Sequence, residues 1–381
     1  MKKIAIIGAG ISGLFIANLL KKNSNYQITI YEKNNSINLE EGYGIQLSVN
    51  SIKLLNEIQF DKFQNNEKFT PDKINFYSNY NFKKICELNI SDFNSQNCKY
   101  TTLKRSVLIN FLKKGLEDLI RTGYSISKID RKDQCIKLSF ENNKTFECDH
   151  LIISDGVFSK CKSLILNNQT KPRYNNTLAI RGTLTQVPNY IDDKNISLFL
   201  GSSFHHVIYP VNANGDLNFI AIMKYQLSVE EQMNYSLFSD SSFIKKVLGK
   251  TLLSNMEFFN NIEKLKIFPI FVSENFYRLK NNNTHLIGDA FFAFPPSFAQ
   301  GASQSIESAY ELFKCIENNT ESNFFKNRAK KIKMVNKRSK FNQFVFHLSN
   351  PVILFLRNFL LKRLVKNKKF LESYLGKVYR N

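Results

Sequence analysis

A glycine-rich turn near the N-terminus constrains this chain more than any other feature of its sequence. It lies between a short apolar strand and a helix, and a second strand follows the helix. The segments are residues 3–7 (strand), Gly8, Gly10, Ser12 and Gly13 (turn), residues 14–22 (helix) and residues 27–31 (strand). Gly8 permits the tight turn, Gly10 lets the backbone approach a pyrophosphate, and Gly13 lets the helix pack close to the strand. Unpaired N–H groups and the helix dipole would hold an anion at the start of the helix.

An acidic residue stands where a nucleotide site of this kind requires one. Glu32 closes the second strand nineteen residues after Gly13, and Lys33 follows it. A carboxylate at the tip of that strand can accept hydrogen bonds from the hydroxyls of a ribose. A glycine turn alone would also suit a structural role, but strand, turn, helix and acid together predict a dinucleotide site.

Length and charge limit the class of protein. The 381 residues, of which 43% are hydrophobic, suffice for two domains or for one large domain with an insertion. The net charge of +21 comes from 53 Lys and Arg against 32 Asp and Glu, a balance that can indicate a nucleic acid or an anionic membrane as partner. Lys and Asn are spread along the whole chain, however, and only the C-terminal end concentrates basic residues. We therefore expect no nucleic-acid partner.

The cysteines and the first residues of the chain indicate the compartment. Six cysteines occur without a Cys-x-x-Cys pair, so we expect no metal site and no disulfide framework. Met1 leads directly into a short apolar segment interrupted by glycines, which is not the pattern of a signal peptide. No stretch has the length of a clean transmembrane helix. We expect a cytoplasmic protein, and the sequence leaves its oligomeric state open.

The rest of the chain alternates between β and α character. Alternation of apolar and polar residues predicts antiparallel strands over residues 72–98 and 171–270 and a hairpin ladder over residues 125–149. Short apolar strands of the kind buried in a parallel sheet end at Asp155-Gly156 and at Gly288-Asp289. Helices are predicted over residues 51–58 and 101–119, from Gly301 onward, and from Phe324 to the C-terminal end.

These segments predict an α/β fold in three parts. A Rossmann-like nucleotide-binding domain would carry an inserted antiparallel β-sheet domain and would be followed by C-terminal helices. We expect the nucleotide-binding domain over residues 1–70, 101–170 and 271–320, the β-rich domain over residues 71–100 and 171–270, and the helical region over residues 321–381.

Three glycine-bearing motifs follow one another in the order typical of a known family. They are the turn from Gly8 to Gly13, Asp155-Gly156 and Gly288-Asp289. With a β-rich insertion between the second and the third, this order resembles the FAD-dependent aromatic monooxygenases of the para-hydroxybenzoate hydroxylase type. Within that group the chain is most similar to the salicylate-hydroxylase and zeaxanthin-epoxidase branch. Further matching segments are Ser154 to Ser159, Ile180 to Gly182, Tyr209-Pro210, and Gly288 through Pro295 to Ala302.

The resemblance implies FAD as the dinucleotide, NAD(P)H as co-substrate and roles for single residues. Asp289 would bind ribityl or ribose hydroxyls, and Gly301 and Ala302 would direct helix N–H groups at the flavin, where negative charge accumulates on reduction. Arg105, a cation in the first turn of its predicted helix, would lie along the FAD. Asp155 is similar to the residue linked to both FAD and NAD(P)H. The implied cofactor-binding set is Gly8, Gly10, Ser12, Gly13, Glu32, Lys33, Gly44, Gln46, Arg105, Asp155, Gly156, Gly288, Asp289, Pro295, Gly301 and Ala302.

The chain departs from the family pattern in two places. Phe292 and Ala293 stand where His and Pro are common, and Lys162 replaces the arginine that follows the Asp-Gly motif. Lysine keeps the charge and loses the bidentate geometry of arginine. The replacement of arginine by Lys162 affects the contact with NAD(P)H that the resemblance implies.

In such enzymes the cofactor carries the chemistry. NAD(P)H reduces FAD, O2 adds to the reduced ring, and the C4a-hydroperoxyflavin delivers one oxygen atom to a phenolic or other electron-rich carbon. The protein positions the substrate and excludes water from the site. Two alternatives stay open: an FAD-dependent reductase or dehydrogenase acting on an isoprenoid or quinone-type substrate, and a flavin-binding protein without activity that docks on a membrane.

Candidate catalytic residues are few and lie in the β-rich insertion. His205, His206 and Tyr209 share one predicted strand, where a base can approach a phenolic hydroxyl. A strand whose histidines are simply exposed to solvent would have the same sequence pattern. Arg181 can bind a substrate carboxylate or form a structural salt bridge.

The segment from Val345 to Phe370 admits two interpretations. Its apolar residues recur near helical spacing among basic ones, and they are Leu348, Val352, Phe355, Phe359, Leu360 and Val365. Pro351 can open the helix, and Arg357 interrupts it, so it is too broken to span a bilayer. Such a helix can lie in a membrane interface and would suit a lipophilic substrate, whereas the resemblance implies helices that cover the active site. We favour the core interpretation, with weak attraction of the basic face to anionic lipid at the inner face of the membrane.

Overall fold

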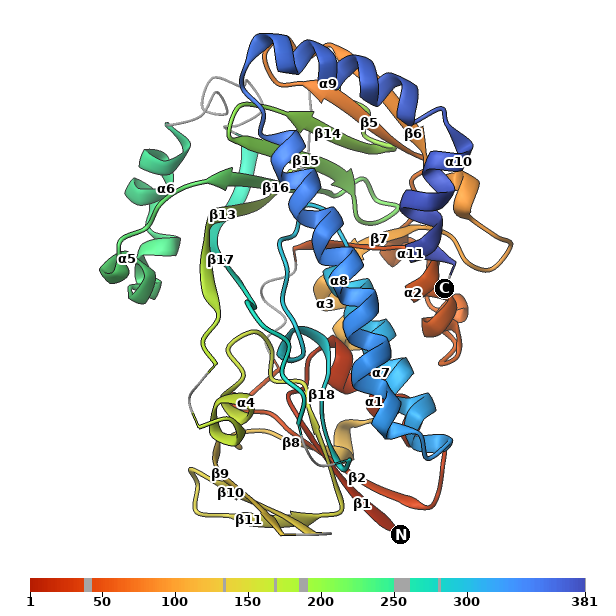
Figure 1. The fold of residues 1–381 in the computed structure, drawn as a ribbon, viewed down its shortest axis with the longest axis vertical. Coiled ribbons are helices and arrows are strands. Elements are labelled where there is room, and N and C mark those ends of the chain that lie inside the picture. The colour runs from red at the N-terminus through yellow and green to blue at the C-terminus, as the bar shows by residue number, and fades with distance from the viewer. Residues whose placement is uncertain are drawn as a thin grey trace.

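A five-stranded parallel sheet organises the end of the molecule that holds the N-terminus (Figure 1). The computed structural model describes residues 1–37, 43–132, 135–167, 170–184, 191–249, 261–279 and 282–380. The sheet has the order β18-β12-β1-β2-β8. Its strands are β1 (Lys2–Ile7), β2 (Tyr26–Tyr31), β8 (Ile120–Arg121), β12 (His150–Ile153) and β18 (Thr284–Leu286). All of β12 and the second half of β1 are buried, as expected for parallel strands covered on both faces.

Helices and a small antiparallel sheet cover these strands. Helices α1 (Ile11–Leu20) and α7 (Gly301–Glu317) lie beside each other, and α3 (Arg105–Lys113) packs on α1. The small sheet has the order β11-β10-β9 and packs on the parallel sheet through aromatic rings. The ring centroids of Phe140 and Tyr31 lie 4.6 Å apart. Its strands are β9 (Ile126–Lys132), β10 (Cys135–Phe140) and β11 (Thr145–Cys148), which confirm the predicted hairpin ladder.

A seven-stranded sheet forms the other half of the molecule (Figure 1). Its order is β17-β13-β16-β15-β14-β5-β6, and only β14 and β5 pair in parallel. The strands are β5 (Lys73–Ser78), β6 (Lys84–Asn89), β13 (Arg173–Leu184), β14 (Ile196–Leu200), β15 (Phe204–Pro210), β16 (Leu217–Lys224) and β17 (Ile262–Val272). The predicted fold class, a Rossmann-like domain with an inserted antiparallel sheet and C-terminal helices, is confirmed. The domain boundaries drawn from the sequence stay a prediction.

A short three-stranded sheet and helix α2 lie between the two halves. The sheet has the order β3-β7-β4, with β3 (Gly44–Leu47), β4 (Lys68–Phe69) and β7 (Thr101–Lys104), and α2 spans Val49–Asn56. The predicted helix over residues 101–119 is therefore wrong at both ends. Its first four residues pair with β3 as a strand that begins with two threonines, a β-branched type that favours strands. Gly115, with a φ of +77°, follows the end of α3.

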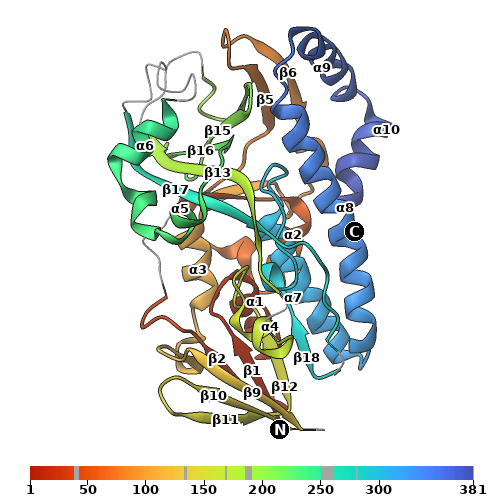
Figure 2. The ribbon, with the colours of Figure 1, turned by 60° about the vertical axis from the view of Figure 1, so that its left-hand side comes forward.

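The C-terminal helices lie on one side of the seven-stranded sheet and the small helices α5 and α6 on the other (Figure 2). The long helix α8 (Glu321–Phe346) runs along the molecule, and α9 (Pro351–Leu364) crosses the region of β5 and β6. The remaining helices are α4 (Lys160–Ile165), α5 (Val229–Met233), α6 (Ser241–Leu248), α10 (Lys368–Leu371) and α11 (Lys377–Tyr379). Pro351 opens α9 as predicted, with Asn350 as its N-cap. Within the described ranges, no helix combines the length and the apolar character needed to cross a membrane.

Candidate active site

The turn between β1 and α1 has the geometry that its glycines predict. Gly8 has a φ of +101°, and a Cβ there would lie 2.6 Å from the carbonyl oxygen of Ser154. A Cβ on Gly13 would lie 2.1 Å from the carbonyl oxygen of Gly8. A Cβ on Gly10 would meet nothing within 4 Å. Packing of the protein itself thus requires glycine at two positions, whereas Gly10 borders open space where the helix begins.

Glu32 lies beside this turn at the end of β2. Its two carboxylate oxygens accept the N–H groups of Ala9, at 3.1 Å, and of Asn34, at 3.0 Å. The next residue, Lys33, is exposed. Glu32 is therefore fixed at the glycine turn, where a ribose would come within its reach.

Gly288 and Asp289 reach the same turn from the end of β18. A Cβ on Gly288, which has a φ of +60°, would lie 2.7 Å from Oγ of Ser12. Asp289 is exposed to a cavity inside the protein, where the surrounding atoms displace solvent, and this desolvation raises its pKa to about 6. The cations of Arg105 and Lys162 oppose this shift. The fold thus brings together three predicted segments that lie far apart in the sequence.

A cavity of about 700 Å³ extends from Asp289 to the seven-stranded sheet and the C-terminal helices. Five of the predicted cofactor-binding residues line it, namely Gly44, Gln46, Asp289, Gly301 and Ala302. Gly301 and Ala302 open α7, so the unpaired N–H groups of that helix point into the cavity. One continuous space therefore joins Asp289 and the start of α7 to the part that lies under the sheet, which we call the chamber.

The chamber is apolar over most of its wall. Alternate residues of the sheet face it, among them Ile74, Phe76, Leu198, Val207, Ile220 and Ile222. The helices contribute residues of the same kind, among them Phe341, Leu356, Leu360, Leu361, Val365 and Leu371. A chamber of this lining excludes water and suits a lipophilic or aromatic ligand.

Asp155, Gly156 and Pro295 are among the members of the predicted set that lie outside this wall. Asp155 accepts the N–H of Cys161 at 3.1 Å, near the start of α4, and burial raises the pKa of Asp155. Gly156, with a φ of +82°, has nothing within 4 Å of its Cβ position. The carbonyl of Pro295 accepts the hydroxyl of Ser339, and the neighbouring Pro296 lines the cavity. Lys162 is buried and donates to the carbonyl of Ala290 at 3.1 Å.

Strand β15 divides the catalytic candidates between its two faces. His205 and Tyr209 line the chamber, and Arg181 of β13 lines it as well. His206 does not, because alternate side chains of a strand point to opposite faces. Its ring stacks on Phe199 at 4.4 Å in the core on the far face, and burial lowers its pKa to about 3. The structure thus replaces His206 by His205 as the histidine that faces the chamber.

His205 is held by a second histidine that the sequence analysis did not single out. Its Nδ1 lies 2.8 Å from Nε2 of His347, the residue that ends α8. Burial lowers the pKa of both rings, so both stay neutral near pH 7. A neutral pair in which one ring donates and the other accepts positions His205 and makes it a weak base. Burial also raises the pKa of Tyr209, which therefore keeps its phenolic proton.

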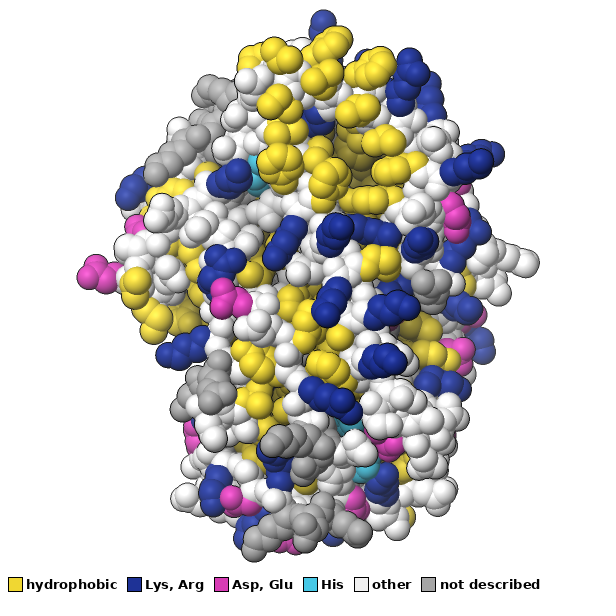
Figure 3. All heavy atoms as spheres, in the orientation of Figure 1, with side chains coloured by type: hydrophobic (Ala, Val, Ile, Leu, Met, Phe, Trp, Pro, Cys, Tyr) yellow, Lys and Arg dark blue, Asp and Glu magenta, His cyan; other side chains and the backbone are white. Residues whose placement is uncertain are grey.

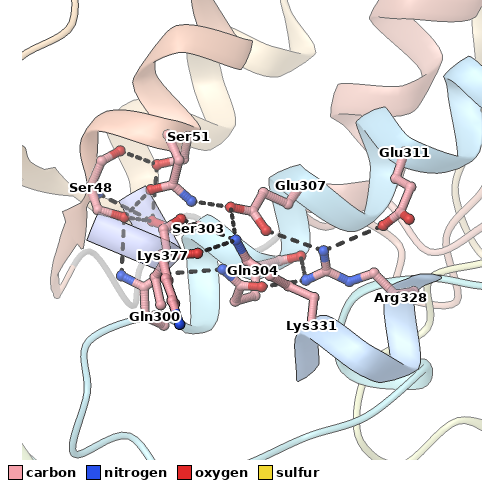
Figure 4. Close-up of polar contacts among 12 residues, drawn as sticks. Ser48, Ser51, Gln300, Ser303, Gln304, Glu307, Glu311, Arg328, Lys331 and Lys377 are labelled. Atoms are coloured by element: carbon pink, nitrogen blue, oxygen red, sulfur yellow. Dashed lines mark hydrogen bonds and ion pairs between the residues drawn. The ribbon is translucent and has the colours of Figure 1, made fainter. Parts of the chain in front are cut away.

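A buried polar network supports the start of α7 and was also missed from the sequence (Figure 4). Gln300, the N-cap of α7, donates to Oγ of Ser48 at 3.0 Å, and Ser303 lies 2.9 Å from Oγ of Ser51. One turn further, Glu307 lies 3.2 Å from Arg328 of α8, and both side chains are almost completely buried. The network ties α7 to α2 and α8 and so holds the helix start that faces the cavity.

Arg357 of α9 is a second guanidinium that lines the chamber. Only 7% of it is exposed. Its Nε and Nη2 donate to Oδ1 of Asn358 at 3.1 and 2.9 Å, and its Nη1 has no hydrogen-bond partner among the described residues. A buried cation with a free donor can bind an acidic or carbonyl group of a ligand.

The core interpretation of the C-terminal segment is right for only part of it. Leu348 and Val365 line the chamber and are partly buried. Val352, Phe355, Phe359 and Leu360 are between 47% and 71% exposed, which contradicts the prediction for these four. The reason is that α9 covers the chamber with one side only, and nothing in the described chain covers its other side.

Comparisons with known proteins agree with these motifs. The family described as an NAD(P)-binding Rossmann-like domain matches residues 6–39. The 3-amino-4-hydroxybenzoate 2-monooxygenase of Streptomyces cremeus is 22% identical, with 83% of this chain and 78% of that protein covered. Salicylate hydroxylase of Pseudomonas putida is 21% identical, with 82% of this chain and 76% of that protein covered. A variant of Klebsiella pneumoniae HpxO, solved with FAD, superimposes with a TM-score of 0.82 at 15% identity over 99% of both chains.

The fold and the motifs are similar to those of flavoproteins of the aromatic-hydroxylase class. The resemblance read from the sequence is confirmed by relatives named as a monooxygenase and a hydroxylase, which are 21–22% identical and extend over about four-fifths of the chain, and by a fold shared with an FAD-bound structure. The donor set fits FAD on structural grounds of its own, because the turn combines open space at Gly10 with the fixed carboxylate of Glu32, and Asp289 and the start of α7 border one cavity. Among the residues that the structure describes, no group of His, Cys, Asp and Glu could hold a metal ion.

Proposed function

We propose that this enzyme holds FAD without a covalent bond, takes electrons from NAD(P)H and inserts one oxygen atom of O2 into an aromatic or other electron-rich, lipophilic substrate. The observation that carries the proposal is the single cavity that joins Asp289 and the start of α7 to the apolar chamber. The flavin, when bound, supplies the reduction by NAD(P)H and the activation of O2. The chain supplies binding, orientation and the exclusion of water.

The residues around the turn would hold the dinucleotide. Glu32 would accept hydrogen bonds from the ribose, Asp289 would accept them from sugar or ribityl hydroxyls, and Gly10 would give the diphosphate room. Gly301 and Ala302 would direct N–H groups at the flavin ring and stabilise the negative charge that reduction creates. The network around Arg328 would keep that helix start in place.

The chamber limits the substrate. The relatives named above act on small ring compounds that carry acidic groups, as their names state. In this chain the wall is mostly apolar, and its polar groups include Arg181, Arg357, His205 and several tyrosines. We therefore favour an aromatic substrate with a lipophilic portion and with an acidic or carbonyl group that a guanidinium can bind.

We further propose a cytoplasmic location, with contact between the C-terminal helices and the inner face of a membrane. All six cysteines are free thiols, which suits a reducing compartment. The exposed apolar side of α9 supports the contact.

A panel of phenols tests the proposed function. We expect the yellow, FAD-loaded protein to oxidise NADH or NADPH slowly alone and faster with lipophilic phenols than with salicylate. Acid precipitation should release the flavin into solution. Equal NAD(P)H oxidation with and without every phenol, or turnover that needs no O2, would favour a reductase instead.

A further inference from the structure

We propose that α9 and the C-terminal end of α8 form a docking face for anionic membranes, and that lipophilic substrate passes from the bilayer into the chamber between their side chains. The docking face consists of Phe341, Phe344, Val352, Phe355, Phe359 and Leu360. The proposal rests on the proposed function for the identity of the substrate class, but the docking itself does not depend on it.

The first observation is that α9 is apolar on two sides and covered on one. Leu361 and Leu364 line the chamber on its inner side. On the outer side Val352 and Phe355 are 68% and 71% exposed, and Phe359 is 47% exposed. A helix that is apolar all round is normally buried, and a contiguous exposed apolar patch marks a contact site. A bilayer would bury this outer side.

The second observation is that the docking face borders the chamber directly. Ile353, Leu356 and Leu360 line the cavity and are also 44%, 51% and 54% exposed. Phe341 of α8 also lines the cavity and is 57% exposed. Figure 3 shows the hydrophobic side chains gathered at the α9 end of the molecule around a hollow with a hydrophobic lining. The rim of the chamber is thus part of the exposed apolar surface.

The third observation is the charge of the surrounding chain. From Ser322 to Leu371 the sequence contains no Asp and no Glu, and it contains fourteen Lys and Arg. Lys362 and Arg363 are exposed at the end of α9, and Lys366, Lys368 and Lys369 follow them. Further Lys and Arg side chains lie next to the apolar patch in Figure 3. Basic residues beside exposed apolar ones are the combination that binds anionic lipid surfaces.

The same charges argue against a second copy of the chain as the occupant. A symmetric contact through the docking face would bring two sets of like charges together, which opposes association. An anionic bilayer offers the opposite charge and an apolar interior at once. The chemistry of the face therefore favours a membrane.

Vesicle sedimentation tests the docking. The full-length, FAD-loaded protein would be mixed with vesicles of phosphatidylcholine, or with vesicles of phosphatidylcholine and phosphatidylglycerol in equal parts. We expect it to sediment with the anionic vesicles and to be released by high salt. The double variant Phe355→Ser, Phe359→Ser should lower the bound fraction about tenfold, because both rings would enter the interface and neither lines the chamber.

A matched control is available on the other side of the seven-stranded sheet. Met233 and Tyr235 are each 71% exposed near α5, so Met233→Ser, Tyr235→Ser removes a similar exposed apolar area. This variant should bind the vesicles like the parent. Equal binding by the parent and the Phe355, Phe359 variant, or no binding by the parent, would overturn the docking. A dimer in solution that the Phe355, Phe359 variant abolishes would also overturn it and assign the face to a second copy.

The route into the chamber needs a kinetic test. A long-chain alkylphenol embedded in anionic vesicles should be oxygenated more slowly by the Phe355, Phe359 variant than by the parent. A short, water-soluble phenol should be turned over equally by both, and FAD content should not change. Equal rates with the embedded phenol would overturn the route, whereas absence of oxygenation with every phenol would instead contradict the proposed function and leave the sedimentation result to decide the docking.

Discussion

Nη1 of Arg328 lies 3.2 Å from a carboxylate oxygen of Glu307, and both side chains are almost completely buried. The pair joins α8 to α7 one to two turns below the helix start that faces the cavity. Nη2 of Arg328 also donates to the carbonyl of Gln304 at 3.1 Å. A support for the helix start that faces the cavity thus comes from the next helix along the chain.

We expect Arg328→Met to destabilise the protein by about 3–5 kcal/mol, since it leaves Glu307 buried without its main partner. Urea denaturation would measure the change. Arg173→Met is the control, because Arg173 pairs with Glu274 at a surface where the two side chains are 57% and 53% exposed, and it should cost about 1 kcal/mol or less. Similar losses of unfolding free energy in the two variants would show that the buried pair stabilises the protein no more than a surface pair does.

Gly10 and Gly13 of the turn should respond differently to substitution. Gly13→Ala should prevent folding or cost more than about 4 kcal/mol, because its Cβ would overlap a carbonyl oxygen at 2.1 Å. Gly10→Val should leave the circular dichroism spectrum unchanged and weaken FAD binding, because its side chain would fill the space for the diphosphate. Fluorescence titration with FAD measures the second effect. A Gly10→Val protein that bound FAD like the parent would place the diphosphate elsewhere.

Asp289 should make the FAD-free protein less stable as the pH rises from about 4 to about 6. Its pKa is raised from 3.8 to about 6, so the folded state holds the proton more tightly than the unfolded state across that window. The contribution is complete below pH 4 and is lost above pH 6. Asp289→Asn should remove this part of the pH dependence of unfolding. FAD affinity should rise over the same window in the parent, because the ionised carboxylate is the better hydrogen-bond acceptor. If FAD affinity depended on pH in the same way in Asp289→Asn, Asp289 would not be a ligand of FAD.

Arg357 should affect the binding of substrate more than the rate of chemistry. We expect Arg357→Met to raise KM for an acidic phenol about tenfold with little change in kcat, the pattern of lost uniform binding. Stability should change little, because the guanidinium donates only to the adjacent Asn358 and its Nη1 has no partner within the described chain. Arg363→Met is the control, since that side chain is exposed and lies over the ring of Phe359 at 4.8 Å. Equal KM values for the two variants would remove Arg357 from the binding site.

The nucleotide turn could be predicted because its signal is local. The positive φ of Gly8 and the close approach of Gly13 to the carbonyl oxygen of Gly8 both arise within the turn, so spacing along the chain carries the information. The helix predicted from residue 101 failed because β3, which is distant in sequence, captures those residues as a strand. The sequence pattern within a segment contains no information about a pairing strand that is distant in the sequence.

The chamber could not be predicted for the same physical reason. Alternation on β15 separates His205 from His206 but does not say which face meets the cavity, and that depends on which side the C-terminal helices cover. The pairing of Glu307 with Arg328 needs two helices to meet. The exposure of Phe355 follows from α9 having a neighbour on one side only.

The central claim is that one cavity holds both the flavin and the substrate, so that oxygen passes directly between them. The most direct measurement reduces the FAD-loaded protein with NADPH or NADH under anaerobic conditions, adds a lipophilic phenol and ¹⁸O2, and analyses the product by mass spectrometry. The account predicts a product with one ¹⁸O atom for each NAD(P)H consumed. Oxidation of NAD(P)H without a labelled product, or the same product formed without oxygen, would contradict it.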